Sequence, residues 1–213
     1  MIIVECEQGS PEWHKERAGV ITASMFETAR AKLKSGPNKG QPTSAALDYA
    51  FRLAVERISG SPLDEGFQTW QMKRGNELEP AARMEHEIQS GLLVKRVGLV
   101  LTDDRVFGAS ADGFIEEDGG SEYKCFLAPE KLRSFHIDND ASGIMDQVQG
   151  CMWITGRKWW HIGMYCPALE PVGKQLWWQE FKRDDNHIEE MESELWQFKL
   201  LVDSYETQLR TAR

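Results

Sequence analysis

The stretch Ser110-Ala111-Asp112-Gly113, followed by Glu122-Tyr123-Lys124, contains the residues that best indicate the fold. Strands are predicted over residues 113–116 and 121–126, and Asp118-Gly119-Gly120 between them predicts a tight hairpin turn. Side chains two apart on a strand share a face, so Glu122 and Lys124 would converge while Tyr123 points the other way. The hairpin would also fold Asp112 back beside Glu122.

Two carboxylates facing one lysine are typical of a metal-dependent phosphodiesterase centre. Mg²⁺ takes oxygen ligands and keeps several waters, so Asp112 and Glu122 would be enough to hold one or two ions beside a phosphate. Such ions activate a water molecule and neutralise the leaving oxygen. Lys124 would position that water or stabilise the pentavalent phosphorane. Metal-assisted cleavage of nucleic acid is the leading hypothesis.

The acid-x-Lys pattern alone does not identify the site, because it occurs twice. The second copy, Glu180-Phe181-Lys182, even has Glu170 ten residues upstream, as Glu122 has Asp112. Context favours the first copy, since Asp112 lies in a small-residue turn between apolar runs, whereas Glu170 precedes Pro171 in a loop-like stretch. The residues leave a second interpretation open, in which Glu122 and Lys124 form an ion pair on a solvated sheet worth at most about 1 kcal/mol.

Composition and charge limit the functional classes. The chain has 213 residues, 41% hydrophobic and 28% charged, and is predicted to form one soluble globular domain over residues 1–213. No apolar run approaches a membrane span and the N-terminus has no basic signal-peptide start, so we expect a cytosolic protein. The four cysteines show no zinc-ligand spacing.

The formal net charge of −9 is unusual for a protein that binds nucleic acid. Residues 28–47 are an exception, because they contain Arg30, Lys32, Lys34 and Lys39 and no acid. This stretch is interpreted either as a mobile loop that contacts phosphates or as a solvated polar loop, and the sequence does not decide between them.

Alternating helix and strand signals predict an α/β fold. Helices are expected to begin at Pro11 and near Ala23 and to cover residues 43–59, 69–89 (bent or restarted at Pro80), 142–155 and 184–209. In the 43–59 helix, a face at helical spacing predicts the core side: Leu47, Phe51, Ala54, Val55 and Ile58. Strands are expected at residues 92–101, 107–109, 159–166 and 175–181, besides those of the hairpin.

A family resemblance becomes visible when four motifs are taken together. They are the segment from Trp13 to Ser24, Arg74-Gly75-Asn76-Glu77-Leu78-Glu79, the Asp112 and Glu122-Tyr123-Lys124-Cys125 pair, and Gln147-Val148-Gln149 before Met152-Trp153. In this order the chain resembles the phage lambda exonuclease group, the viral YqaJ-type alkaline exonucleases of the PD-(D/E)xK nuclease superfamily. The resemblance favours Glu122 and Lys124 over the second acid-x-Lys copy.

The resemblance implies a central mixed β-sheet flanked by helices, the restriction endonuclease-like core. It also implies a ring-shaped homotrimer that degrades one strand of double-stranded DNA from its 5′ end and releases 5′-mononucleotides. The 3′ overhang would pass to a single-strand annealing protein in phage-type recombination. The cofactor would be Mg²⁺, with two ions and Mn²⁺ as a substitute. The setting would be the cytoplasm of a bacterial host, with a phage or prophage origin.

Site roles follow from the resemblance position by position. Asp112, Glu122 and the Tyr123 carbonyl match the metal ligands, Glu79 matches a carboxylate that reaches the metals through water, and Lys124 matches the catalytic lysine. Four further residues match positions that hold the 5′-terminal phosphate: Arg17, Ser24, Ser110 and Gln147. Ala111 stands where the family often has proline, and the segment between Lys124 and Gln147 is shorter than in the phage enzyme.

Two alternatives remain besides an exonuclease. One is an endonuclease or resolvase with the same metal centre that acts on internal phosphodiesters. The other is a non-catalytic DNA-binding adaptor of a recombination complex. An exonuclease requires a pocket that accepts only a terminal phosphate, and Arg17 offers a planar, charged fork suited to it.

Overall fold

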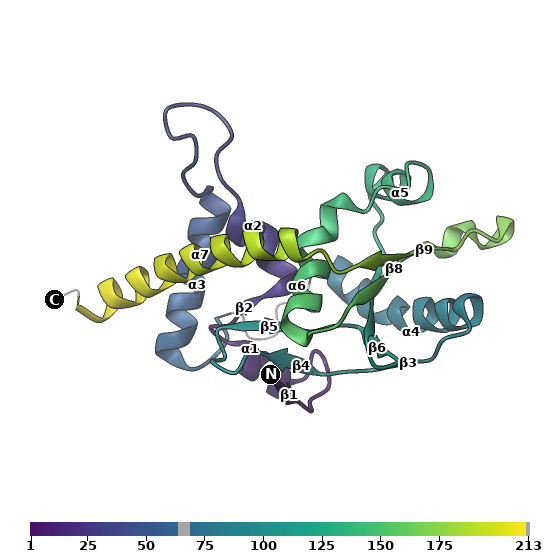
Figure 1. Cartoon of the computed structure of the whole chain (residues 1–213), viewed down its shortest axis with the longest axis horizontal. Helices are drawn as coiled ribbons and strands as arrows, with labels where there is room; N and C mark the ends of the chain where they lie inside the picture. Colours follow the sequence, from purple (N-terminus) through teal and green to yellow (C-terminus); the bar gives the residue numbers. More distant parts are fainter. Residues whose placement is uncertain (64–68, 212–213) are drawn as a thin grey trace.

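The computed structural model describes residues 1–63 and 69–211, and its strands form two mixed sheets between helices (Figure 1). The four-stranded sheet has the order β1-β4-β5-β2, with β2 parallel to β5. Its strands are β1 (Ile2–Val4), β2 (Ile21–Thr22), β4 (Leu99–Leu101) and β5 (Phe107–Ala109). The α/β fold class expected from the sequence is confirmed, with the strands divided between two sheets.

The five-stranded sheet has the order β3-β6-β7-β8-β9, and only β7 and β8 are parallel. Its strands are β3 (Val94–Lys95), β6 (Gly113–Ile115), β7 (Gly119–Lys124), β8 (Trp159–Tyr165) and β9 (Leu176–Lys182). Strand β7 is therefore central and β9 is an edge strand. The predicted strands of both candidate acid-x-Lys stretches are present.

The helices cover both sheets. They are α1 (Pro11–Arg17), η1 (Ala23–Met25), α2 (Phe26–Arg30), α3 (Ser44–Ser59), α4 (Trp70–Ser90), α5 (Pro129–His136), η2 (Ser142–Ile144), α6 (Met145–Thr155), η3 (Pro167–Val172) and α7 (Asp185–Thr211). Helix α4 packs on β7, β8 and β9, while α6 contacts β4, β5 and β8 and so joins the two sheets. Helices α3 and α7 lie side by side at one end of the molecule (Figure 1). No helix within residues 1–63 and 69–211 is long and apolar enough to cross a membrane.

Local capping fixes the ends of two helices. Ser10 caps α1 by accepting from the Trp13 N–H at 3.2 Å, and Pro11 takes the first helical position. Thr43 caps α3, and Gly60 ends it with φ 69°. Helix α4 continues through Pro80 as one element, so the predicted alternative of a restart there is wrong. Strand β1 and helix α5 were not predicted from the sequence.

The hairpin turn differs from the prediction. Residues 116–118 form the turn, with Glu116 at φ 49°, and Gly119 and Gly120 already belong to β7. Both glycines are needed for close packing, because a Cβ would lie 2.2 Å from the Trp159 ring at Gly119 and 2.2 Å from the Trp160 ring at Gly120. Asp118 therefore ends the turn, while Gly119 and Gly120 are glycines because the strand packs against two tryptophan rings.

The predicted strand over residues 92–101 is split into β3 and β4, which belong to different sheets. Gly98 lies at the crossing, where a Cβ would be 2.4 Å from the Val4 carbonyl oxygen. Only glycine fits this close approach of two backbones. The split places β4 under the N-terminal segment while β3 remains beside the β6–β7 hairpin.

Helix α3 is a core helix, but the predicted buried face is wrong in part. Leu47, Phe51 and Ile58 are exposed, and the buried apolar residues are Ala46, Tyr49, Ala50, Leu53 and Ala54. The alanines allow close approach of the neighbouring helices, and the Tyr49 ring stacks on Phe198 of α7 at 5.4 Å. Packing against α7 therefore selected a face with smaller side chains than the one that the bulky residues predicted.

Candidate active site

Strand β7 carries the centre of the site. Lys124 Nζ donates to Glu122 Oε1 at 2.9 Å, so the two side chains meet on one face as their spacing predicted. Gln147, on the first turn of α6, completes the group: its Nε2 donates to Glu122 Oε1 at 2.7 Å, and its Oε1 accepts from Lys124 Nζ at 2.8 Å. The three side chains form a closed ring of hydrogen bonds.

The other oxygen of the Glu122 carboxylate is left without a partner. Glu122 is 5% exposed, and its Oε2 atom is buried with no hydrogen-bond donor within the described part of the chain. A buried carboxylate oxygen without a partner is costly, because it has lost its water and gained nothing in exchange. A cation would satisfy it, so this atom fits the metal ligand expected here.

Asp112 lies beside Glu122 as the hairpin predicted. Gly113 pairs with Ser121, which places Asp112 next to Glu122, and Asp112 Oδ2 accepts from the Tyr123 N–H at 2.6 Å. Burial, followed by the charges of Glu122 and Glu79, raises the pKa of Asp112 well above its usual value. The carboxylates thus oppose one another's ionisation, and a divalent cation between them would relieve this repulsion.

Glu79 approaches the same group from helix α4. Its Oε1 accepts from Arg83 Nη1 at 3.2 Å, one helical turn further on. Burial raises the pKa of Glu79, the nearby Arg83 and Arg96 lower it, and Glu122 raises it further. Within residues 1–63 and 69–211, no three His, Cys, Asp or Glu side chains are grouped closely enough to enclose an ion by themselves. The donors present suit a hard cation that keeps part of its water shell.

Lys124 is held as a cation at this centre. Burial by itself would lower the pKa of Lys124, but the carboxylates of Glu122 and Asp112 outweigh it and raise that pKa. A charged ammonium fixed by two hydrogen bonds is a directed donor rather than a mobile surface charge. It is suited to hold a water molecule or a phosphate oxygen near the carboxylates.

Arg17, Ser24 and Ser110 form a second group around α1 and β2. Arg17 Nη2 donates to Thr22 Oγ1 at 3.1 Å and lies 3.5 Å from Ser24 Oγ. The guanidinium carbon stands 4.1 Å from the centre of the Trp13 ring, and Trp13 Nε1 donates to Ser110 Oγ at 3.0 Å. Ser110 is thus joined to Arg17 through Trp13 and not directly.

The Arg17 guanidinium has unused donor capacity. Its Nε atom is buried and has no acceptor in the described residues. Burial lowers the pKa of Arg17 from its usual value, but a guanidinium remains charged near neutrality. A charged donor without an anion partner, set beside two hydroxyl groups, is a suitable place for a phosphate.

Gln147 does not join the Arg17 group, because it is bonded to Glu122 and Lys124. A cavity of about 350 Å³ connects the two groups, since Ser24, Lys124 and Gln147 all line it. Phe126 and Asp146 also border it. Of the nine residues predicted from the sequence, Ser24, Lys124 and Gln147 therefore line this cavity, and the other six belong to the metal-type centre or to the anion-type group without lining it.

A family model, the YqaJ-like viral recombinase domain, matches residues 12–158, which is more than half of the chain. The chain belongs to this family. No curated protein matches it in sequence.

Solved structures agree with the family assignment. The YqaJ-like chain is similar to the alkaline exonuclease LHK-Exo from Laribacter hongkongensis, with a TM-score of 0.80, 28% identity and coverage of 94% of this chain and 96% of that one. The LHK-Exo complex with dAMP matches with a TM-score of 0.82 and the same identity and coverage. A phage-related exonuclease from Haemophilus somnus 129PT shares the fold, with a TM-score of 0.68, 16% identity and coverage of 91% and 96%.

The anion-type group of this YqaJ-like protein includes two residues that the sequence did not identify as site residues. Trp13 and Thr22 are the contacts that orient Arg17, and Thr22 N–H donates to the Tyr49 hydroxyl of α3 at 3.2 Å. Both lie inside the Trp13 to Ser24 motif. One feature of the sequence hinted at this role, because Thr22 lies two residues before Ser24 and five after Arg17. The side chains meet only because the chain turns after α1.

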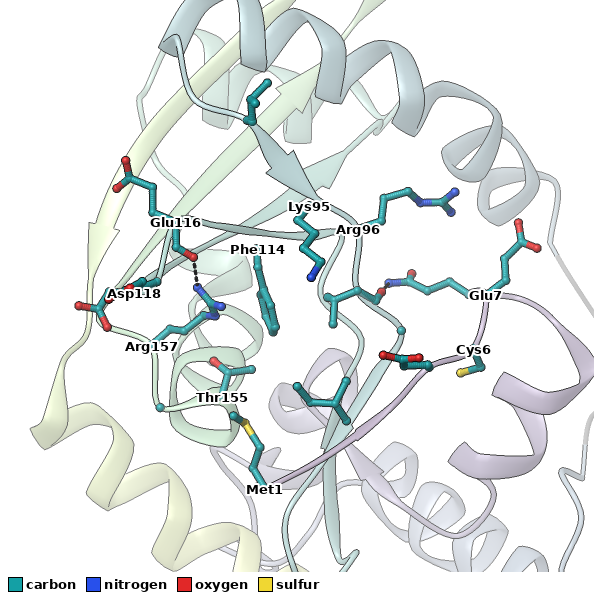
Figure 2. Close-up of a pocket in the computed structure, with 18 residues that line it drawn as sticks. Met1, Cys6, Glu7, Lys95, Arg96, Phe114, Glu116, Asp118, Thr155 and Arg157 are labelled. Atoms are coloured by element: carbon teal, nitrogen blue, oxygen red, sulfur yellow. Dashed lines mark hydrogen bonds between the residues drawn. The ribbon is translucent and has the colours of Figure 1, made fainter.

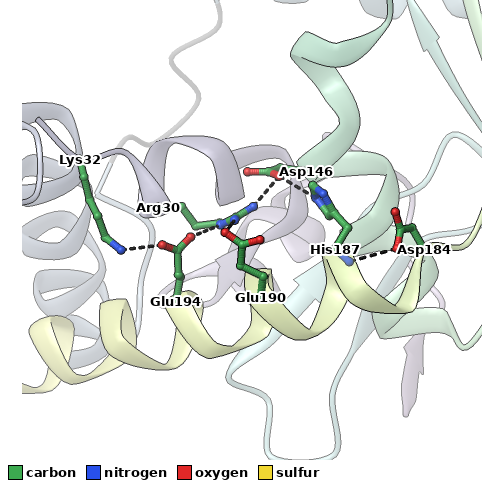
Figure 3. A network of polar contacts seen from close by, with 7 residues as sticks. All are labelled: Arg30, Lys32, Asp146, Asp184, His187, Glu190 and Glu194. Atoms are coloured by element: carbon green, nitrogen blue, oxygen red, sulfur yellow. Dashed lines mark hydrogen bonds and ion pairs between the residues drawn. The ribbon is translucent and has the colours of Figure 1, made fainter. Parts of the chain in front are cut away.

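The structure separates the basic stretch into two parts. Arg30 bonds Asp146 at 2.6 Å and Glu194 at 2.7 Å, and Lys32 bonds Glu194 at 2.5 Å (Figure 3). His187 Nε2 also lies 2.9 Å from Asp146, the residue before Gln147. This network ties α2 and α7 to the first turn of α6. Lys34 and Lys39 remain exposed, with no ion pair in residues 1–63 and 69–211.

A larger cavity of about 1120 Å³ lies apart from this centre, between the N-terminal segment and the β6–β7 hairpin (Figure 2). None of the predicted site residues lines it. Arg157 faces it but is occupied, because its guanidinium stands 3.7 Å from the Phe114 ring centre and donates to the carbonyls of Glu116 at 3.2 Å and Gly119 at 2.6 Å. The larger cavity and the candidate active site therefore lie in different parts of the molecule.

Proposed function

We propose that this protein is a Mg²⁺-dependent exonuclease that degrades one strand of double-stranded DNA from the 5′ end. It would release 5′-mononucleotides and leave a 3′ single-stranded overhang for recombination. Family membership supports a nuclease that acts in recombination. The observation that carries the proposal is the partnerless, buried Glu122 Oε2 beside Asp112 and Lys124, at a cavity shared with Ser24.

The residues present fit a metal centre. Asp112, Glu122 and the Tyr123 carbonyl would hold the cation, and Glu79 would reach it through water. Mg²⁺, or Mn²⁺ in its place, would lower the pKa of a bound water molecule and neutralise charge on the phosphate, with two ions the expected number. Lys124 would orient the attacking water or the phosphate oxygens with its charged Nζ, while Gln147 fixes Lys124.

The Arg17 group would give the enzyme its dependence on DNA ends. Arg17, Ser24 and Ser110 would bind a 5′-terminal phosphate, and Gln147 would contribute from the other side of the cavity. An internal phosphodiester has two oxygens esterified to sugar carbons, whereas a terminal phosphate has only one. The internal group therefore does not fit a site that encloses the phosphate on its free side. Arg17 supplies a charged hydrogen bond that is about twice as strong as a neutral one.

The net charge of −9 requires another means of holding DNA. We propose a homotrimeric ring, which retains a duplex by enclosing it and needs positive charge only along its bore. A single-strand annealing protein would receive the 3′ overhang. The protein would act in the cytoplasm of a bacterial host, as part of a phage or prophage.

The experiment compares linear and closed circular duplexes. Wild type with Mg²⁺ should convert a 5′-phosphorylated linear duplex to mononucleotides and leave covalently closed circles intact. Asp112→Asn should abolish degradation, because it removes a carboxylate charge from the metal centre. A 5′ label should be released before a 3′ label.

Two outcomes would favour the alternatives. Mg²⁺-dependent cutting of closed circles would indicate an endonuclease or resolvase with the same centre. DNA binding by wild type with no hydrolysis of any substrate, in Mg²⁺ or Mn²⁺, would indicate a non-catalytic adaptor.

A further inference from the structure

A chain of polar contacts, most of them buried, runs behind the metal-type centre. Tyr123 points to the face of β7 opposite Glu122 and Lys124, and its hydroxyl lies 2.8 Å from His86 Nδ1 on α4. His86 Nε2 lies 2.9 Å from His161 Nδ1 on β8, and His161 Nε2 lies 3.5 Å from Glu180 Oε2 on β9. We call these four residues the Tyr123–Glu180 relay. None of them takes part in the proposed hydrolysis through its side chain.

The relay is enclosed by close packing. His86 is 0% exposed and His161 is 3% exposed. The Trp178 ring covers both histidines, with ring centres 5.2 Å from His86 and 4.8 Å from His161. Gly163, which pairs with Tyr123, leaves the space for the phenol ring, since a Cβ there would be 2.8 Å from Tyr123 Cδ1. Water is therefore a poor substitute for any member that is lost.

The direction of each hydrogen bond follows from the carboxylate at the open end. A carboxylate oxygen 3.5 Å from His161 Nε2 favours the proton on Nε2, so His161 accepts at Nδ1. His86 then donates through Nε2–H and accepts at Nδ1, which leaves the Tyr123 hydroxyl as the donor to His86. Burial keeps both rings neutral, because it lowers the pKa of His161 and, together with His161, lowers the pKa of His86 to about 4. Each ring nitrogen along this path faces one polar partner, and Lys182 Nζ lies 2.6 Å from the other oxygen of Glu180.

Tyr123 and His86, the first two members of the relay, connect the elements that carry the site. Glu79 and His86 are seven residues apart on α4, so they lie on the same side of that helix. Tyr123 lies between Glu122 and Lys124, and its backbone N–H holds Asp112 at 2.6 Å. The hydroxyl of Tyr123 thus ties the helix that presents Glu79 to the strand that presents the other carboxylates.

We propose that the Tyr123–Glu180 relay positions the metal centre by fixing α4 on β7. Tyr123, His86 and His161 are positioning residues, and Glu180 orients the chain of donors. The inference rests on the proposed function, because it gives the relay a role in holding a cation. A purely structural role would change the stability of the fold and leave the affinity of the folded protein for metal unchanged.

The test measures Mn²⁺ binding to the full protein by titration calorimetry without DNA. Tyr123→Phe removes the donor and keeps the ring, and Tyr165→Phe is the matched control, because its hydroxyl makes no hydrogen bond within the described residues. Tyr123→Phe should weaken Mn²⁺ binding about tenfold, as losses of outer partners of metal ligands do, while Tyr165→Phe should match wild type. Measurements are made at a temperature where both variants are fully folded.

A kinetic readout gives a second criterion. Tyr123→Phe should lower kcat at limiting Mn²⁺, recover at higher Mn²⁺, and change KM for linear DNA less than about twofold. His86→Leu should weaken metal binding further; if it does not fold, Tyr123→Phe decides alone. Wild-type Mn²⁺ affinity in Tyr123→Phe would overturn the relay and leave the proposed function intact. Absence of Mn²⁺ binding and hydrolysis in wild type would overturn both.

Discussion

The two acid-x-Lys stretches of this chain share a sequence pattern and differ in how far their side chains are exposed to solvent. Glu122 and Lys124 have side chains that are 6% and 19% exposed, whereas those of Glu180 and Lys182 are 39% and 70% exposed. Both pairs are ion pairs, at 2.9 Å and 2.6 Å. Distance therefore does not distinguish them, but exposure does.

The position of each strand in the sheet explains this difference. Strand β7 lies between β6 and β8, α4 packs on it, and Gln147 of α6 bonds its Glu122 and Lys124, while β9 is an edge strand with one neighbour. The exposed pair on β9 is hydrated and contributes at most about 1 kcal/mol. The pair on β7 is desolvated, so the remaining oxygen of Glu122 has no water to bind, and it favours a cation.

The largest expected effect is a direct test of this contrast. Lys124→Ala should lower the rate of linear duplex degradation by about 10²–10³-fold, because it removes a fixed charge from the site of hydrolysis. Lys182→Ala should stay within about twofold of wild type, because its charge faces solvent. The measurement is the initial rate at saturating DNA and Mg²⁺. Equal losses in both variants would remove the distinction between the two stretches, and equal activity in both would exclude Lys124 from the mechanism.

Much of the local structure was predictable, because local signals decide it. Alternation on a strand placed Glu122 and Lys124 on one face, and the hairpin spacing placed Asp112 beside them. Ser10 followed by Pro11 likewise marked the start of α1. The residues around the two acid-x-Lys stretches favoured the Glu122 stretch as the site, and the family resemblance decided between them. Neither predicted that Glu122 is buried and Glu180 is exposed.

What the sequence did not predict depends on contacts between distant segments. Gly119 and Gly120 were predicted to lie in a turn. Their actual role is to make room for the rings of Trp159 and Trp160, which lie forty residues later and give no local signal. The buried face of α3 was chosen by α7, which follows it by more than a hundred residues. The unpaired Oε2 atom of Glu122 and the contact of Thr22 with Arg17 depend on the folded arrangement, so no local sequence pattern predicts them.

A smaller effect is expected from the anion-type group, which accompanies the β7 stretch and has no counterpart on β9. Arg17→Ala should slow digestion of 5′-phosphorylated ends by about 10–100-fold, since a hydrogen bond to a charged group contributes roughly 1.5–3 kcal/mol. Digestion of 5′-hydroxyl ends should change much less. The control is Arg105→Ala, a half-exposed arginine that pairs with Glu16. Identical losses on both kinds of end would show that Arg17 does not bind the terminal phosphate.

The smallest effect concerns the link between the two stretches, since the relay runs from Tyr123 in the first to Glu180 in the second. The pKa of His86 is about 4 in the folded protein and 6.5 as a free side chain, so the unfolded state binds more protons between these values. Stability from neutral His86 is therefore complete above about pH 6.5 and decreases as the pH falls towards 4, by up to about 1.4 kcal/mol per pH unit.

Asp112 and Glu79 act in the opposite direction, because their raised pKa values favour the folded protein at low pH. A comparison with His86→Gln, which keeps polar atoms at the site and does not titrate, removes their contribution. Urea unfolding in EDTA at pH 7.0 and 5.5 should show that wild type loses about 1 kcal/mol more than the variant over this interval. If both lose the same amount, His86 is not held neutral by burial, and the direction assigned to each hydrogen bond of the relay is wrong.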